Sequence, residues 1–366
     1  MTRLEEVQAK LERIRAMMAA EELDAVILCA QTNFAWVTGG GDSHVVMGTE
    51  QGVASALITA DRQYVVTDNI EAGRIAAEEV AGLEFEVVAD EWHLNNMTEV
   101  IGRLVTGDVA ADGNWLPGAM DLGDTIGQLT WQLLPPEVER YRALGADVSE
   151  ALEQSAREIE PGQSEHEIAA VLTGKLMRAG IQPLVILIAV DDRIRNFRHP
   201  IPTATTLRQY AMLVASVRRH GLHLSATRLV HFGELPEDLR HRHYACVQVD
   251  TCLNLESRPG ATVGEVFARA ARIYAETGYP EEWRLHHQGG ATGYQGRSYK
   301  ATHSTPHRVL ANQAFAWNPS ITGTKSEDTI LATLDGPEIL SPVRDWPTIQ
   351  VEYEGRTMVR PDILVR

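Results

Sequence analysis

The stretch Leu23-Asp-Ala-Val-Ile-Leu-Cys-Ala30 is an apolar run with the length and composition of a buried β-strand. An N-terminal helix is predicted before it, because apolar residues recur there at helical spacing, namely Leu4, Val7, Leu11, Ile14 and Met18. Strand-like runs at 54–59 and 63–67 flank a turn, and a helical stretch at 70–80 precedes a short strand at 85–88. This order predicts a small α/β domain with one central sheet.

A second domain follows a segment rich in Gly, Asp and Pro at 108–122. Leu133-Leu-Pro-Pro-Glu-Val-Glu-Arg140 has prolines near the first turn of a long predicted helix, so we place the boundary there and expect domains 1–132 and 133–366. Two helices broken at Pro161-Gly162 are followed by β-rich segments, at 184–190, 212–217, 222–230, 315–317 and 329–333. We predict an α+β domain with helices on one face of a curved, mostly antiparallel sheet.

The composition is that of a soluble globular protein. The chain has 366 residues, 44% hydrophobic and 23% charged, and a formal charge of −17 from 33 basic and 50 acidic side chains. Such a charge disfavours nucleic acid or an anionic membrane as a partner. Three cysteines without C-x-x-C spacing indicate neither a disulfide framework nor a zinc ribbon. Neither a signal segment nor an apolar run of membrane length is present, so a cytoplasmic location is expected.

Several short motifs resemble those of one enzyme family. Landmarks occur at Asn33-Phe-Ala-Trp-Val-Thr-Gly39, Pro136-Glu-Val-Glu-Arg140, Glu160-Pro-Gly162 and Arg198-His-Pro-Ile-Pro-Thr203. Three more follow in the order of that family's active-site motifs, at Leu224-Ser-Ala-Thr-Arg228, His286-His-Gln-Gly-Gly-Ala-Thr-Gly293 and Ser326-Glu-Asp-Thr-Ile330. Over nearly its whole length the chain resembles the creatinase, aminopeptidase P and prolidase family, M24. The resemblance implies a creatinase-type N-terminal domain, a C-terminal pita-bread domain and a homodimer.

The resemblance also implies where metal ligands would lie. In peptidases of this family, two Asp, one His and two Glu hold two divalent metals. The corresponding positions here are Val214, Ser225, Gly290, Asn318 and Glu327. One carboxylate cannot neutralise and bridge two dications, so we expect no metal pair and no cofactor. By ligand type alone, a single-metal site built from His286, His303 and Glu327 is an alternative.

Metal-free chemistry has a precedent in the family, because creatinase hydrolyses a C–N bond with a histidine as acid and base. His199 matches that histidine, and an imidazole with a pKa of about 6.5 can carry a proton at neutral pH. We therefore predict His199, His286 and Glu327 as catalytic, with Glu327 orienting His199 or holding a cationic substrate group. The alternatives are a structural His199, and His287 in place of His286 if the register is off by one.

Three further residues are expected to bind substrate: His303, Arg228 and Asn318. Arg228 could bind a substrate carboxylate or pair with Glu327, and a purely structural ion pair is the alternative. His303 matches a family motif only with a shift of several residues, so it could also be an ordinary loop histidine.

Three functional hypotheses follow. The first is a metal-free relative of the Xaa-Pro peptidases that acts on a small polar C–N compound or a peptide-like ligand. The second is a non-catalytic binding protein, since pita-bread domains also serve as interaction modules, for example in a histone chaperone. The third is a true Xaa-Pro metallopeptidase with unusual ligands. Specificity depends on loop geometry that no motif determines, so the sequence does not name the substrate.

Overall fold

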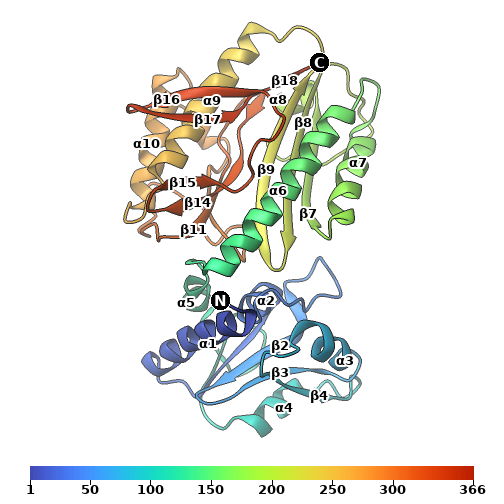
Figure 1. The fold of residues 1–366 in the computed structure, drawn as a ribbon, viewed down its shortest axis with the longest axis vertical. Helices are drawn as coiled ribbons and strands as arrows, with labels where there is room; N and C mark the ends of the chain where they lie inside the picture. Colours follow the sequence, from blue (N-terminus) through green and yellow to red (C-terminus); the bar gives the residue numbers. More distant parts are fainter. The chain divides into compact units, whose positions relative to one another are not determined.

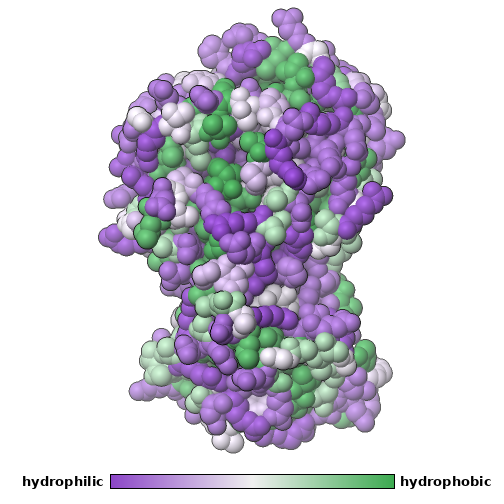
Figure 2. All heavy atoms as spheres, viewed as in Figure 1, coloured by the Kyte–Doolittle hydropathy of each residue, from purple (hydrophilic) through white to green (hydrophobic).

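The computed structural model describes residues 1–366, and the chain forms two compact units. Unit 1 comprises Met1–Glu139 with His220–Leu222, and unit 2 comprises Arg140–Arg219 with His223–Arg366. None of the helices is long and apolar enough to cross a membrane. On the face shown in Figure 2, hydrophilic residues predominate and apolar residues are interspersed among them in both units.

Unit 1 is built on a six-stranded mixed sheet with the strand order β4-β3-β2-β1-β5-β6 (Figure 1). The expected apolar run forms its buried strand β1, which pairs antiparallel with β2 and parallel with β5. The strands are β1 (Ala25–Ala30), β2 (Gln51–Thr59), β3 (Gln63–Asp68), β4 (Glu86–Asp90), β5 (Val109–Ala111) and β6 (Met120–Asp121). The helices are α1 (Arg3–Ala20), α2 (Gln31–Val37), α3 (Ala72–Arg74), the π-helix η1 (Ile75–Glu79), α4 (Met97–Leu104) and α5 (Gly123–Leu129).

Helix α1 shows how local sequence sets an element of this unit. The side chain of Thr2 accepts a hydrogen bond from the main chain of Glu5, and the Glu5 carboxylate accepts one from the Thr2 N–H, which is a capping box. Val7, Leu11 and Ile14 are buried at helical spacing, as the sequence predicts. The helix therefore begins at a cap and buries one apolar face.

Unit 2 holds two four-stranded sheets and two hairpins. One sheet has the order β18-β9-β8-β7, the other β10-β11-β14-β15, and the hairpins are β12-β13 and β16-β17. β10 with β11, β11 with β14, β14 with β15 and β7 with β8 pair antiparallel, and β18 pairs parallel with β9, as expected for a mostly antiparallel sheet. The strands are β7 (Gln182–Val190), β8 (Tyr210–Arg219), β9 (Leu222–His231), β10 (Gly289–Thr292), β11 (Gln313–Trp317), β12 (Ser320–Ile321), β13 (Thr324–Lys325), β14 (Asp328–Thr333), β15 (Gly336–Ile339), β16 (Thr348–Tyr353), β17 (Arg356–Pro361) and β18 (Leu364–Val365).

Helices cover these sheets. In Figure 1, α7 lies along β7, and α9 and α10 lie beside the strands β11 to β17. An apolar core joins α9 and α10 to β11 and β14 through buried residues that include Cys246, Phe267, Phe315 and Ile330. The helices are α6 (Pro135–Glu158), which contains the division between the units, α7 (Glu165–Arg178), α8 (Asp192–Asn196), α9 (Glu237–Glu256), α10 (Val263–Glu276) and the 3-10 helix η2 (Glu282–Arg284).

Candidate active site

Three histidines from two loops of unit 2 come together. His199 follows α8, and His286 and His287 lie between η2 and β10. The Nε2 atoms of His199 and His286 are 3.0 Å apart, and one potential ligand nitrogen from each of the three rings lies within 4.8 Å of the others. His286 is buried, His287 half-buried and His199 exposed, so the cluster runs from the protein interior to solvent. The structure thus joins His199 to both the predicted His286 and its alternative, His287.

An ion pair holds the two loops against each other. Nη2 of Arg198 donates to Glu282, at 2.6 Å, and to Oγ1 of Thr322, at 2.9 Å. Glu282 also accepts the N–H of Thr322, at 3.0 Å. Arg198 adjoins His199, and Glu282 lies four residues before His286. This contact therefore fixes the position of one imidazole relative to the other. The Gln288 side chain adds a second restraint by donating to the His286 carbonyl, at 2.6 Å.

All three imidazoles are neutral at pH 7. Burial, reinforced by the charge of Lys325, lowers the pKa of His286 to about 2. Burial and the charge of Arg297 lower the pKa of His287 to about 4. The pKa of His199 is also lowered, first by burial and then by Lys325, while Glu327 acts in the opposite direction. A neutral His199 can accept a proton, whereas His286 has too low a pKa to carry one.

Hydrogen bonds indicate which ring nitrogens carry protons. Nδ1 of His287 accepts the Gly289 N–H at 3.3 Å, so the neutral ring carries its proton on Nε2. In the contact between His199 and His286, one Nε2 donates and the other accepts. Nδ1 of His286 faces Oγ of Ser320 at 3.5 Å, the outer limit for such a bond. The cluster can therefore both donate and accept hydrogen bonds without gaining charge.

Glu327 lies in a buried ion-pair network and contacts none of these imidazoles. Its Oε2 accepts from Nζ of Lys325 and from Oγ1 of Thr227, both at 2.7 Å, and its Oε1 faces Nη2 of Arg297 at 3.5 Å. Burial alone would raise the pKa of Glu327, but the charges of Lys325 and Arg297 hold that pKa below its usual value. The hydrogen bond to His199 that an orienting carboxylate requires is not formed.

The positions that match the family's metal ligands do not fit two dications. Val214 packs in an apolar cluster with Leu187 and Met212. Oγ of Ser225 donates to Oγ of Ser216, at 3.0 Å. Asn318 is buried, and its side-chain oxygen has no hydrogen-bond partner. These neutral groups supply no charge to offset a metal pair, and the oxygens of Glu327 already face two cations.

Gly290, at the position of the family's histidine ligand, has no space for a side chain. Its φ is +154°, and a Cβ there would lie 2.1 Å from the Tyr299 carbonyl oxygen. The segment after β10 lies against this strand, with the Ala301 N–H donating to the Gly289 carbonyl at 2.9 Å. The loss of the ligand is therefore accompanied by a local backbone packing that excludes any larger residue.

A single metal is a second possibility, because three histidines can bind zinc. The alternative predicted from His286, His303 and Glu327 is not assembled, since His303 packs on the rings of Phe267 and Trp283. In the cluster that does form, Nδ1 of His287 accepts a hydrogen bond, whereas a ligating histidine usually donates one from its second nitrogen. No carboxylate pairs with these three rings, and nearby cations lower their pKa values, so the surroundings disfavour a dication.

Two predicted substrate-binding residues form their contacts with residues outside the cluster. Arg228 is fully buried, and its Nη1 donates to Oδ1 of Asp328 at 3.0 Å and to the Thr227 carbonyl at 2.8 Å. It therefore makes the structural ion pair considered as the alternative, and with Asp328 rather than Glu327. His303 is exposed and contacts aromatic rings. Asn318 stays close, since its N–H donates to the Gln288 carbonyl at 3.1 Å.

Sequence reasoning missed the charged residues around the site. Lys325 and Arg297 pair with Glu327, and Arg198 with Glu282. Lys325 lies two residues before Glu327, a spacing typical of one face of a strand, which is a weak signal. Arg297 and Glu282 carry no motif, because only the fold brings them to the cluster.

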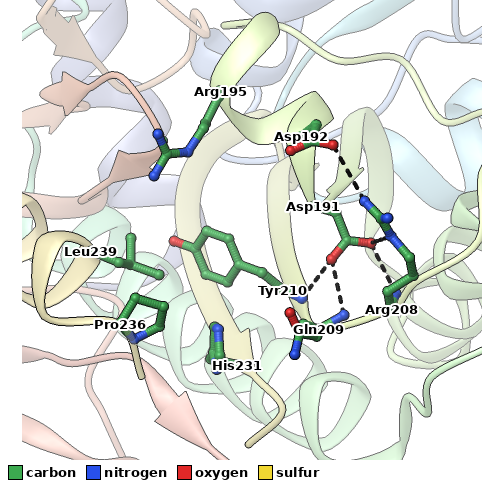
Figure 3. Close-up of a pocket in the computed structure, with 10 residues that line it drawn as sticks. Asp191, Asp192, Arg195, Arg208, Gln209, Tyr210, His231, Pro236 and Leu239 are labelled. Atoms are coloured by element: carbon green, nitrogen blue, oxygen red, sulfur yellow. Dashed lines mark hydrogen bonds and ion pairs between the residues drawn. The ribbon is translucent and has the colours of Figure 1, made fainter. Parts of the chain in front are cut away.

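A cavity in unit 2, of about 330 Å³, lies beside α8 and is separate from the histidine cluster (Figure 3). Its acidic and basic side chains largely pair with each other. The Asp191 carboxylate accepts the main-chain N–H groups of Arg208, Gln209 and Tyr210, and Arg208 also faces Asp192 at 3.3 Å. Arg195 pairs with Asp238 at 3.2 Å. The charged groups here are balanced, unlike those around the histidines.

Two family models match the chain. The Creatinase/Prolidase N-terminal domain matches residues 10–144, and Metallopeptidase family M24 matches residues 139–334, more than half of the chain. The chain belongs to metallopeptidase family M24. The resemblance inferred from the motifs and the predicted fold class of this M24 chain are both confirmed.

Known proteins agree with this M24 assignment. An uncharacterized peptidase of Staphylococcus aureus is 23% identical over 234 residues, which are 61% of this chain and 66% of that protein, just under two thirds of its length. The prolidase from Pyrococcus horikoshii superposes with a TM-score of 0.78 at 18% identity, covering 92% of this chain and 99% of that one. The Xaa-Pro dipeptidase from Bacillus anthracis gives 0.77 at 16% identity, covering 98% and 100%. At these identities the structures establish the shared fold.

Proposed function

We propose that this M24 protein is a metal-independent hydrolase that cleaves a C–N bond in a small polar or peptide-like substrate. The observation that carries the proposal is the contact between His199 and His286, whose Nε2 atoms are 3.0 Å apart at a solvent-exposed edge. A neutral imidazole in contact with solvent, restrained by a second imidazole, has the properties of a general base.

The proposed reaction uses His199 as base and then as acid. His199 accepts a proton from water, and the water oxygen attacks the carbon of the C–N bond. The same proton then passes from His199 to the leaving nitrogen, so that the C–N bond breaks and the imidazole is neutral again. The pKa of His286 is about 2, so His286 stays neutral and acts as a positioning residue through its hydrogen bond.

The charges around Glu327 support the metal-independent part of the proposal. Lys325 and Arg297 face the surviving carboxylate at 2.7 and 3.5 Å and supply positive charge beside it. Fixed cations of this kind can stabilise an oxyanion that develops on the substrate, the role that a metal plays in other hydrolases. Glu327 thus serves as a positioning residue for these cations.

One observation favours a second candidate function, a ligand-binding protein without catalysis. None of the three imidazoles forms an ion pair with a carboxylate, although such a partner commonly orients a catalytic histidine. A cluster of neutral imidazoles with cations nearby can bind a polar ligand without turning it over.

Product analysis of the purified protein can separate these functions. The panel would contain Xaa-Pro dipeptides, other dipeptides, and small amides, ureas and amidines, with products followed by mass spectrometry in the presence and absence of EDTA. We expect turnover that survives EDTA and falls by roughly 10²–10⁴-fold in His199→Ala. His241→Ala is the matched control, because His241 is a strongly exposed histidine on α9 whose side chain is 78% exposed.

Turnover that requires added Mn, Co or Zn would contradict the proposal and favour a metallopeptidase. A ligand that binds unchanged, with equal affinity for the wild type and His199→Ala, would instead establish the binding function.

A further inference from the structure

The cavity beside α8 has exposed charged residues on one side and buried residues on the other (Figure 3). Arg195 and Arg208 are exposed and belong to the charged side. Tyr210 and His231, with 8% and 5% of their surfaces exposed, supply the buried polar groups, and Leu239 is buried beside them. The cavity therefore leads from a charged surface to a buried polar end.

Strand pairing brings the two buried polar residues together. Tyr210 begins β8 and His231 ends β9, and these strands are neighbours in one sheet. The Phe232 N–H donates to the Gln209 carbonyl at 2.7 Å, which holds the two strand ends side by side. The ring centroids of Tyr210 and His231 are 5.9 Å apart. The buried end of the cavity is thus built on regular strands rather than on loops.

The hydroxyl of Tyr210 is buried and has no hydrogen-bond partner. In Figure 3 it points into the space between Arg195 and Leu239, which also line the cavity. Burial raises the pKa of Tyr210, an effect that nearby Thr324 partly opposes, so the hydroxyl keeps its proton. Oγ1 of Thr324 itself faces Nδ1 of His243 at 2.8 Å. A buried hydroxyl without a partner is destabilising, and a ligand in the cavity would explain why it is retained.

His231 offers a second free polar atom. Its Nδ1 lies 3.2 Å from the Gly233 carbonyl oxygen. A carbonyl can only accept a hydrogen bond, so Nδ1 carries the proton, and Nε2 of the neutral ring is an acceptor. No hydrogen bond within the protein occupies Nε2. The buried end of the cavity therefore presents one free acceptor and one free hydroxyl.

The charged side of the cavity favours a neutral ligand. Arg208 faces Asp192 at 3.3 Å, and Arg195 faces Asp238 at 3.2 Å. Each positive charge thus has a carboxylate partner of its own. A charged ligand would have to displace one of these partners, whereas a neutral ligand would not.

We propose that this cavity is a binding site, separate from the histidine cluster, for a small neutral ring compound that carries a hydroxyl or N–H group. The ligand would donate a hydrogen bond to Nε2 of His231 and share one with the Tyr210 hydroxyl, and its ring would pack against Leu239 and Pro236, which line the cavity. An apolar cavity of about 150 Å³ holds benzene, so the 330 Å³ here have room for a ring with substituents.

Three simple probes separate the chemical classes. Phenol carries the donor, toluene has nearly the same shape without it, and benzoate carries a negative charge. Binding would be followed at pH 7.5 through the imidazole ¹⁵N resonances of labelled protein, with the His231 signals assigned from His231→Phe. We expect phenol to shift the Nε2 signal of His231 saturably and to bind about three- to tenfold more tightly than toluene, the ratio that one hydrogen bond between neutral groups supplies. Benzoate should bind more weakly than phenol.

Variants locate the site. Tyr210→Phe and His231→Phe should each weaken phenol binding about three- to tenfold, here measured by titration calorimetry, and Tyr210→Phe should unfold at the same or a higher temperature than the wild type, because it removes an unpartnered hydroxyl. His241→Phe, at a histidine on the surface of α9, and His199→Ala, in the cluster, should bind phenol like the wild type. The inference fails if phenol gives no saturable shift, if toluene or benzoate binds as tightly as phenol, or if neither Tyr210→Phe nor His231→Phe weakens phenol binding.

Discussion

Removing the charge of Lys325 tests whether this lysine holds Glu327 in the protein interior. Lys325→Met keeps most of the side-chain length and leaves Glu327, 3% exposed, with Thr227 and the more distant Arg297. Removing one partner of a buried pair costs about 3–5 kcal/mol, and we expect the lower end because Arg297 remains. For a unit of this size, 3 kcal/mol corresponds to a fall in Tm of roughly 6–12 °C.

The matched control is Lys175→Met. Lys175 pairs with Glu158 at 2.9 Å, a similar distance, but the glutamate side chain is 56% exposed. A surface pair of this kind contributes about 0–1 kcal/mol, so the control should change Tm by at most a few degrees. Both variants would be measured by thermal and urea unfolding at pH 7.

Lowering the pH tests the same ion pair a second time, because the direction in which the stability difference should change is known. In the wild type the pKa of Glu327 is below 4.5, so its stabilising contribution is present above pH 4.5 and is lost as the pH falls further. Without Lys325, burial raises the pKa of Glu327. As the pH falls, the Glu327 carboxylate is therefore protonated earlier in the variant than in the wild type, and protonation removes the cost of burying its charge. The stability difference should shrink as the pH falls from 7 towards 4, and Glu327→Gln should rescue part of it. A loss no larger than that of Lys175→Met, or one independent of pH, would refute the reasoning.

Three further predictions follow from the site. Glu282→Gln breaks the ion pair with Arg198. In the turnover assay described above, kcat should fall by a larger factor than KM rises, because the relative position of His199 and His286 is lost rather than substrate binding. The pKa values of His286 and His287 lie below 6.5, so the unfolded chain takes up protons first, and Tm should fall more steeply below pH 6.5 in the wild type than in His286→Asn. Gly290→Ala should destabilise by about 1–3 kcal/mol more than Gly293→Ala in urea unfolding, because Gly293 has a similar φ of +148° but open space; equal effects would reject the close contact.

The sequence predicts the fold largely because hydrophobic periodicity and motif order are local signals. The buried strand Ala25–Ala30, the helix α1 with its cap and the antiparallel β-rich second half all follow from such patterns. In the site, His199 and His286 were predicted together and lie 3.0 Å apart at their Nε2 atoms.

The remaining features of the site depend on contacts between distant segments. Arg228 and Glu327 both follow from motifs, yet Arg228 pairs with Asp328, and Glu327 pairs with Lys325 and Arg297 instead of an imidazole. The motif does not distinguish the two adjacent carboxylates, of which Asp328 begins β14 and Glu327 precedes it. The packing of the segment 299–301 against Gly290 is likewise a contact that no periodicity reveals.

The most direct test of the central claim is the metal content of the purified protein. The protein would be incubated with Mn, Co and Zn, desalted, and analysed by elemental mass spectrometry, with a prolidase of this family as a positive control. The site described here predicts well below one equivalent of metal per chain for all three ions. Two equivalents, or one equivalent that His199→Ala and His286→Ala abolish, would contradict it.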